Sequence, residues 1–120
     1  MIKTYGLTHI NLEVADPDVS LRFYTSLFGV KEYFRDADSI QVRGPGPHDV
    51  LAFVRSGTAG AVGGISHFGF RLTDPNDIND AVAAAERAGA RIIERGEFAP
   101  GLPFVYLADP DGYVIEIWYE

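Results

Sequence analysis

The chain has 120 residues, of which 47% are hydrophobic, so it is long enough for one folded domain with a hydrophobic core. Its formal net charge of −7 disfavours nucleic acids and anionic membranes as partners, because both attract basic surfaces. The absence of cysteine excludes disulfides and thiolate metal sites. No apolar run approaches the roughly 20 residues that cross a bilayer, and residues 1–6 hold no apolar signal segment, so we expect a cytoplasmic protein.

The first half of the chain predicts a strand, a helix and three more strands. Residues 7–15 alternate apolar and polar side chains, which is typical of a half-buried strand. Asp16-Pro17 then marks the start of a helix over residues 17–28, because Asp caps free backbone N–H groups and Pro fits a first helical turn. Gly29 suits the end of that helix. Short strands are expected at residues 30–34, 39–43 and 50–55.

The second half repeats this pattern. Residues 65–75 align with residues 7–17, so that His67 matches His9 and the two Asp-Pro pairs coincide. A helix is expected over residues 75–88, followed by strands at residues 90–94, 104–108 and 113–119. The predicted fold class is α+β, with paired β-α-β-β-β modules forming a curved mixed sheet with helices on its convex face. One domain, residues 1–120, would contain modules at about 1–55 and 65–120, joined by a linker over 55–64.

Strand alternation predicts that three metal-binding side chains lie on one face. Ile10 and Leu12 should pack on the first helix, which turns His9 to the opposite, concave face. The same alternation turns His67 and Glu116 to that face. Two imidazoles and one carboxylate suit a divalent cation and leave coordination positions open. The alternative is that each His is an ordinary surface or hydrogen-bonded residue.

These segments resemble the vicinal oxygen chelate superfamily, also called the glyoxalase, bleomycin-resistance and extradiol dioxygenase superfamily. The resemblance rests on residues 7–14 with 23–30, on residues 65–70, and on the closing run Tyr106-Leu107-Ala108-Asp109-Pro110-Asp111-Gly112-Tyr113-Val114-Ile115-Glu116. It implies the paired-module fold and one divalent metal ion (Fe, Zn, Mn, Ni or Co) held by His9, His67 and Glu116.

Departures from the family pattern narrow the expected chemistry. Glyoxalase I and methylmalonyl-CoA epimerase use a fourth ligand near the end of the first module, where the sequence alignment places Phe53, whose ring cannot coordinate. Extradiol dioxygenases and fosfomycin-modifying transferases use three ligands. Tyr106 matches the acid/base tyrosine of the ring-cleaving enzymes. Those enzymes also carry a His that is not a metal ligand shortly before that tyrosine, and this chain lacks it. The transferases need a cluster of cations, for which only Arg71 and Arg43 are available.

The sequence therefore predicts a metal-dependent enzyme, either a dioxygenase or a glyoxalase-like lyase or isomerase, that chelates vicinal oxygens of a small substrate. Tyr106 is the predicted catalytic proton or hydrogen-bond donor. An aromatic wall would favour a flat or hydrophobic ligand. The predicted substrate-binding residues are Asn11, Phe53, Arg71, Phe104 and Trp118. The alternative is a metal-free, bleomycin-resistance-like protein that sequesters a drug.

Two expectations concern assembly and the remaining histidine. Short members of the family are usually dimeric, so the resemblance implies a homodimer, with the metal site either within one chain or shared between two. His48 lies in a loop of the first half, where a solvated histidine is the more common outcome.

Overall fold

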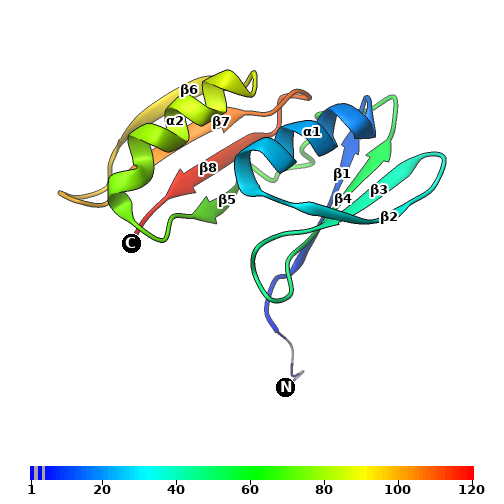
Figure 1. The fold of residues 1–120 in the computed structure, drawn as a ribbon, viewed down its shortest axis with the longest axis horizontal. Helices are drawn as coiled ribbons and strands as arrows, with labels where there is room; N and C mark the ends of the chain where they lie inside the picture. The colour runs from blue at the N-terminus through cyan, green and yellow to red at the C-terminus, as the bar shows by residue number, and fades with distance from the viewer. Residues whose placement is uncertain (2, 4) are drawn as a thin grey trace. The chain divides into compact units, whose positions relative to one another are not determined.

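Both halves of the repeat fold into the predicted β-α-β-β-β modules (Figure 1). The computed structural model describes residues 1, 3 and 5–120; Ile2 and Thr4, in the N-terminal stretch predicted to lack a signal segment, lie outside the described residues. The chain divides into a first unit, Met1–Gly60, and a second unit, Ala61–Glu120. Each unit is described by itself.

The first unit contains one helix and a four-stranded sheet. The strands lie in the order β1-β4-β3-β2, with β1 and β4 parallel and the other neighbours antiparallel. The elements are β1 (His9–Val14), α1 (Pro17–Phe28), β2 (Lys31–Arg35), β3 (Ser39–Arg43) and β4 (Val50–Arg55).

The second unit repeats this topology, with strand order β5-β8-β7-β6 and one parallel pair, β5 and β8. A register shift interrupts the β2–β3 ladder and the β6–β7 ladder at corresponding places, which extends the internal repeat to the backbone. The elements are β5 (Phe68–Arg71), a 3₁₀ turn η1 (Pro75–Asp77), α2 (Ile78–Arg87), β6 (Arg91–Glu97), β7 (Pro103–Ala108) and β8 (Val114–Trp118).

The Asp-Pro pairs cap the helices as predicted. The Asp16 carboxylate accepts a hydrogen bond from the Asp18 backbone N–H at 3.0 Å, and Asp74 accepts one from Asn76 at 2.9 Å. The second helical segment differs from the expectation, because its first three residues form the 3₁₀ turn and the α-helix begins only at Ile78. Such tighter turns are common at helix ends.

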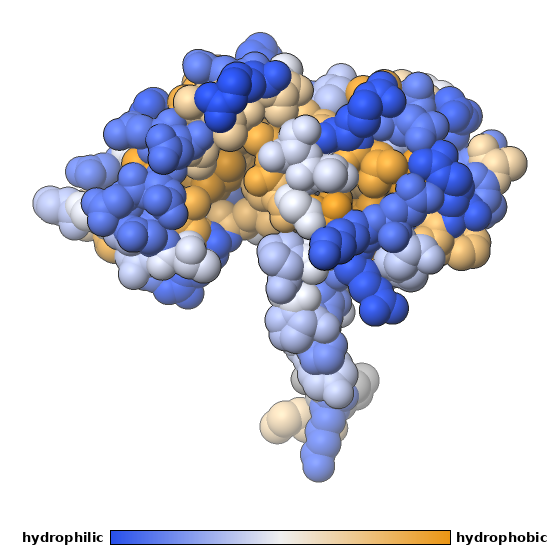
Figure 2. All heavy atoms as spheres, viewed as in Figure 1, coloured by the Kyte–Doolittle hydropathy of each residue, from blue (hydrophilic) through white to orange (hydrophobic). Residues whose placement is uncertain are grey.

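Each helix packs on one face of its own sheet and closes a small core. α1 contacts β3 and β4, and the Tyr24 ring lies 5.1 Å from the Phe53 ring. α2 contacts β6, β7 and β8 through buried residues that include Val82 and Ala85. Hydrophilic residues cover much of the visible surface, with hydrophobic atoms showing between them (Figure 2). No helix in the described part of the chain combines the length and apolar character that a membrane span requires.

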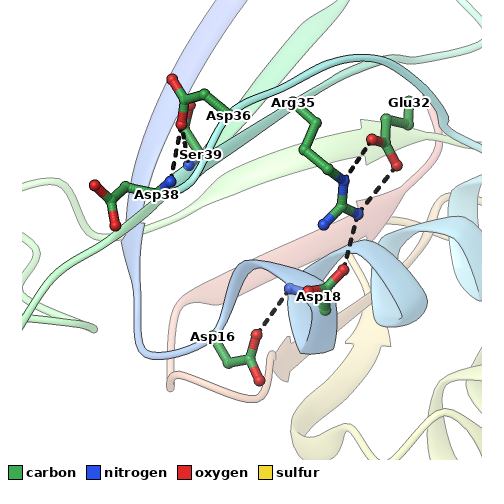
Figure 3. Close-up of polar contacts among 7 residues, drawn as sticks. All are labelled: Asp16, Asp18, Glu32, Arg35, Asp36, Asp38 and Ser39. Carbon is green, nitrogen blue, oxygen red and sulfur yellow. Dashed lines mark hydrogen bonds and ion pairs between the residues drawn. The ribbon is translucent and has the colours of Figure 1, made fainter.

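A surface network ties α1 to β2 in the first unit (Figure 3). The Arg35 guanidinium donates to Asp18 on α1 at 2.8 Å and to Glu32 at 2.7 Å. These hydrogen bonds raise the pKa of Arg35 and lower the pKa values of both carboxyls. All three groups are solvent-exposed, so the network positions the strand more than it stabilises the fold.

Candidate functional site

The predicted strand faces are confirmed by burial. On β1, Leu12 and Val14 are buried toward the helix, whereas His9, Asn11 and Glu13 are exposed. On β8, Ile115 and Ile117 are buried, and Glu116 and Trp118 face the other way. The side of each sheet that faces away from its helix therefore carries the polar candidates.

His67 and Glu116 meet on this face of the second unit. The His67 Nε2 atom lies 3.3 Å from the Glu116 Oε2 atom, and the glutamate side chain is only 12% exposed. On the other side of the ring, the Ser66 hydroxyl lies 3.1 Å from His67 Nδ1. A hydroxyl can accept as well as donate, so Ser66 can support the tautomer in which Nδ1 is protonated and Nε2 is free to bind a cation.

Tyr106 borders this His67–Glu116 pair. It lies directly opposite Glu116 across the β7–β8 ladder, and its ring lies 5.0 Å from the His67 ring in an edge-to-face arrangement. Burial raises the pKa of the Tyr106 phenol, and a hydrogen bond with Glu116 and the negative charges of Glu116 and Glu94 raise it further. The phenol therefore keeps its proton at neutral pH and can donate a hydrogen bond beside the pair.

An aromatic strip continues from Tyr106 along β7. The rings of Phe104 and Tyr106 lie 5.4 Å apart, and Phe98 stacks on Phe104 at 4.6 Å. The Phe104 ring lies against Gly96 on β6, where an added Cβ would meet the ring at 3.2 Å. The strip, defined as Phe98, Phe104 and Tyr106, gives the face an apolar aromatic surface next to the polar pair.

Arg71 and Trp118 occupy the other flank of the pair. The Arg71 guanidinium lies 5.4 Å from the Trp118 ring centre and 6.0 Å from that of Tyr119. The Trp118 indole lies close to Gly69. A Cβ added at residue 69 would be 3.1 Å from the Trp118 Nε1 atom. A glycine at residue 69 therefore leaves room for the indole beside β5.

The first unit has no carboxylate at the position that corresponds to Glu116. The strand register pairs Asn11 with Ala52, just as it pairs Gly69 with Glu116, so Ala52 is the structural counterpart of Glu116. The sequence alignment that placed Phe53 there is off by one residue. Phe53 is fully buried against Tyr24, on the helix side, and the prediction that it lines the concave face is wrong. A methyl side chain at residue 52 cannot coordinate a metal either.

The other candidates of the first unit are exposed. His9 and Asn11 lie on the helix-free side of β1. The Arg43 guanidinium lies 4.7 Å from the Tyr33 ring centre. His48 stacks on Tyr5 at 3.8 Å and is exposed, as expected of a loop residue.

The distance between the His67 nitrogen and the Glu116 oxygen suits two ligands of one metal ion. Two ligands at about 2.0–2.2 Å from one cation are about 3.0–3.5 Å apart, and the nitrogen and oxygen of the pair are 3.3 Å apart. Within the described residues, no group of three or more His, Asp and Glu side chains surrounds one point. The pair alone is thus what the second unit offers to a cation.

Three contributors to this face were not predicted from the sequence. Ser66 precedes β5 and contacts His67, and Phe98 follows β6 and extends the strip. Glu94 lies opposite Tyr106 in the β6–β7 register. The register shift between Ile92 and Glu94 breaks the alternation of β6, so residue parity could not assign Glu94 to a face.

Comparison with known proteins identifies relatives over nearly the whole length. Residues 6–117 match the sequence profile described as Glyoxalase/Bleomycin resistance protein/Dioxygenase superfamily. An uncharacterized protein of Pseudomonas aeruginosa is 30% identical over 94% of this chain and 87% of its own length.

Solved structures share the fold at low sequence identity. A glyoxalase/bleomycin resistance protein from Albidiferax ferrireducens is 25% identical, with a TM-score of 0.76 over 95% of this chain and 98% of its own. A lactoylglutathione lyase from Agrobacterium tumefaciens is 18% identical, with a TM-score of 0.76 over 98% of this chain and 96% of its own. A fosfomycin resistance protein from Listeria monocytogenes, solved with Mn(II) and a dihydroxypropylphosphonic acid, is 15% identical, with a TM-score of 0.80 over 96% of this chain and 90% of its own.

Proposed function

We propose a metal-dependent enzymatic activity for this chain, which belongs to the glyoxalase/bleomycin resistance protein/dioxygenase superfamily. The observation that carries the proposal is the His67–Glu116 pair, whose donor atoms lie 3.3 Å apart on the helix-free face of the second sheet. The Mn(II) complex of the Listeria fosfomycin resistance protein supports it, because that protein has the same fold.

We propose that His67 and Glu116 hold one divalent cation (Fe, Zn, Mn, Ni or Co) together with His9. The place of His9 in this set rests on the sequence repeat, in which His9 and His67 occupy the same position. When bound, the cation supplies a Lewis acid to which two neighbouring oxygens of a substrate coordinate.

The site residues predicted from the sequence would give each part of a substrate a partner. Tyr106 keeps a proton next to Glu116 and can donate it, or a hydrogen bond, to a substrate oxygen. Phe104 and Trp118 are the proposed apolar contacts of the substrate, and Asn11 and Arg71 are the proposed polar contacts. Ala52 occupies the position that corresponds to Glu116 and cannot serve as a fourth protein ligand. This favours a three-ligand enzyme over a four-ligand isomerase.

Metal analysis of purified variants tests the ligand assignment. We expect wild-type protein reconstituted with Zn(II) and desalted to retain about one ion per chain, and His67→Ala, Glu116→Gln and His9→Ala to retain far less. The matched control is His48→Ala, because His48 stacks on Tyr5 in a loop and does not belong to the proposed ligand set. Metal content that His67→Ala leaves unchanged would contradict the assignment.

A metal-free drug-binding protein is the alternative function, and the aromatic strip is the observation that favours it. Tight binding of a flat aromatic drug that is insensitive to a chelator, in a chain that retains no metal, would support this alternative. Oxygen uptake with a catechol by the Fe(II)-loaded chain would support a dioxygenase.

We also propose that the chain acts as a homodimer on a small-molecule substrate. Each unit exposes large apolar side chains on its outer strands, among them Phe34 and Ile93. Light scattering coupled to size-exclusion chromatography should give twice the 13.1 kDa mass of one chain. A mass of one chain at micromolar concentration would refute the dimer.

A further inference from the structure

We infer that the substrate is a planar aromatic carboxylate, whose ring lies on Phe104 and Trp118 and whose carboxylate binds the guanidinium of Arg71. This inference rests on the proposed metal site, because it takes the His67–Glu116 pair as the point where the other end of the substrate is held. It adds to the proposed function the charge of the substrate and the residue that selects for it.

The Arg71 guanidinium lies beside two aromatic rings and has hydrogen-bonding capacity to spare. Its Cζ atom is 5.4 Å from the centre of the Trp118 ring and 6.0 Å from that of the Tyr119 ring, distances at which the rings attract a cation. Among the residues that the structure describes, no carboxylate lies within ion-pair distance of it, and the residue is exposed. A guanidinium held by its face presents its N–H donors at its edge, where a planar carboxylate can accept two parallel hydrogen bonds.

The strand register places Arg71 next to the metal-binding pair on the same sheet face. Gly69 lies opposite Glu116 and Arg71 lies opposite Trp118, so Arg71 is two residues farther along the parallel β5–β8 pair. Two residues of a strand span about 6.5–7 Å. A molecule with oxygens at the pair and a carboxylate at Arg71 therefore connects neighbouring positions of one sheet face, which suits a ligand on the scale of one substituted benzene ring.

The side chains between these two points are aromatic. Phe104 lies directly opposite Trp118 in the β7–β8 register. These two residues are two positions along their strands from Tyr106 and Glu116, which also lie opposite each other. Both rings are half-buried and lie on the helix-free face. An aliphatic acid would leave this surface poorly covered, whereas a flat ring can stack on it.

The charge of the chain makes Arg71 a selective element. The formal net charge is −7, and Glu94 and Glu116 both flank Tyr106, so the field around the face disfavours anions. A carboxylate gains enough to bind only where a cation contacts it directly. A single guanidinium matches one carboxylate, whereas binding a doubly charged phosphonate here would need further cations.

Paired ligands that differ only in charge test the inference. Dihydroxyphenylacetate and its neutral amide, dihydroxyphenylacetamide, both with adjacent hydroxyls, are titrated anaerobically into Zn(II)-loaded protein by calorimetry. We expect wild type to bind the acid about tenfold or more tightly than the amide, the size of one charge-assisted hydrogen-bonded contact. Trp118 is the only tryptophan of the chain, so its fluorescence should change on binding and report that the ligand lies at this place.

Substitutions at Arg71 separate its role from that of the metal site. Arg71→Ala should retain Zn(II) and amide affinity but lose the preference for the acid, and Arg71→Lys should keep part of that preference. The matched control, Arg87→Ala, removes one positive charge from the exposed end of α2 and should leave the preference unchanged.

Each result has one meaning for the inference. Equal wild-type affinity for acid and amide, a preference that survives Arg71→Ala, or no binding of either ligand by Zn(II)-loaded protein would overturn it. Loss of Zn(II) from the wild-type chain would instead overturn the metal site itself, and metal analysis of the same samples distinguishes that failure.

Discussion

The Asp36 carboxylate organises the turn between β2 and β3. Its Oδ1 atom accepts hydrogen bonds from the backbone N–H groups of Asp38 at 2.9 Å and Ser39 at 2.7 Å (Figure 3). These bonds, first that from Asp38 and then those from Ser39, lower the pKa of Asp36 from its ordinary value of 3.8. A depressed folded-state pKa means that the contribution to stability is complete above the pKa of the unfolded chain and is lost as the pH falls through the folded value.

Replacing Asp36 should therefore destabilise the protein in a pH-dependent way. We expect Asp36→Asn to lower the free energy of unfolding near neutral pH, and the deficit relative to wild type to shrink as the pH falls below about 4. Urea denaturation at neutral pH and at about pH 3 measures it. The matched control is Asp38→Asn, because the Asp38 carboxylate makes no hydrogen bond in the described part of the chain. A deficit that does not change with pH would show that the charge of Asp36 is unimportant.

Phe53 is a core residue, which predicts a large effect on stability. Its side chain is fully buried and contacts the Tyr24 ring. We expect Phe53→Ala to lower the free energy of unfolding by about 3–5 kcal/mol, the usual cost of a phenyl-sized cavity. Phe104→Ala, at a half-buried position of the aromatic strip, should cost clearly less. Equal losses for the two variants by urea denaturation would contradict the assignment of Phe53 to the core.

The misplacement of Phe53 shows where sequence reasoning reached its limit at the level of single residues. The faces of His67, Glu116 and Tyr106 followed from alternation within strands, because one buried face fixes the parity of every residue in a regular strand. The partner of Glu116 in the first unit depended instead on counting across a loop. The β3–β4 loop, residues 44–49, is longer than the β7–β8 loop, residues 109–113, so aligning the two closing strands by their loops shifts the register by one.

At the level of elements, the sequence predicted the order of helices and strands because its start and stop signals are local. Asp16 and Asp74 each accept a backbone hydrogen bond at a helix start, as their side chains predict. Boundaries set by tertiary pairing were predicted less well. β6 extends to Glu97, beyond the predicted residue 94, because its ladder with β7 continues past the register shift to Pro103. The neighbouring residues of β6 alone do not reveal that its end pairs with Pro103 of β7.

Gly29 ends α1 in a backbone conformation that predicts a specific cost for alanine. Its φ angle is 61°, in the left-handed region, and its N–H donates to the Thr25 carbonyl at 3.0 Å. No other atom lies within 4 Å of the place where a Cβ would be, so the cost of a side chain arises from the backbone alone. We expect Gly29→Ala to lower the free energy of unfolding by about 1–2 kcal/mol.

The matched control for this prediction is Gly57→Ala. That position also has open space around the added Cβ, but its φ angle is not positive. Alanine should be neutral or slightly stabilising there, because it reduces the entropy of the unfolded chain. Thermal unfolding followed by circular dichroism measures both variants, and equal melting temperatures would contradict the role of the left-handed cap.

At the scale of the whole molecule, two units of the same topology carry different sets of reactive side chains. The second unit brings together an imidazole, a carboxylate and a phenol, whereas the first has Ala52 at the counterpart of Glu116. The two units share one fold, yet among the described residues these reactive groups meet in the second unit alone. The proposed third ligand, His9, would make metal binding depend on the folding of both.

Metal binding should therefore stabilise the whole chain. A ligand that binds only the native state raises the free energy of unfolding by about 2.7 kcal/mol at a free concentration 100 times its Kd. We expect Zn(II) to raise the melting temperature of wild type and of His48→Ala by several degrees in scanning calorimetry, and a chelator to reverse the shift. His67→Ala should show little or no shift.

His9→Ala decides whether the first unit takes part. If His9 is the third ligand, this variant should lose most of the Zn(II) shift, as His67→Ala does, although the two residues are 58 positions apart in the sequence. Zn(II) should then also merge any separate unfolding steps of the two units into one, because the complete ligand set exists only when both are folded. A full shift in His9→Ala, with unfolding of only one unit delayed, would restrict the metal site to the second unit and leave His67 and Glu116 as its protein ligands.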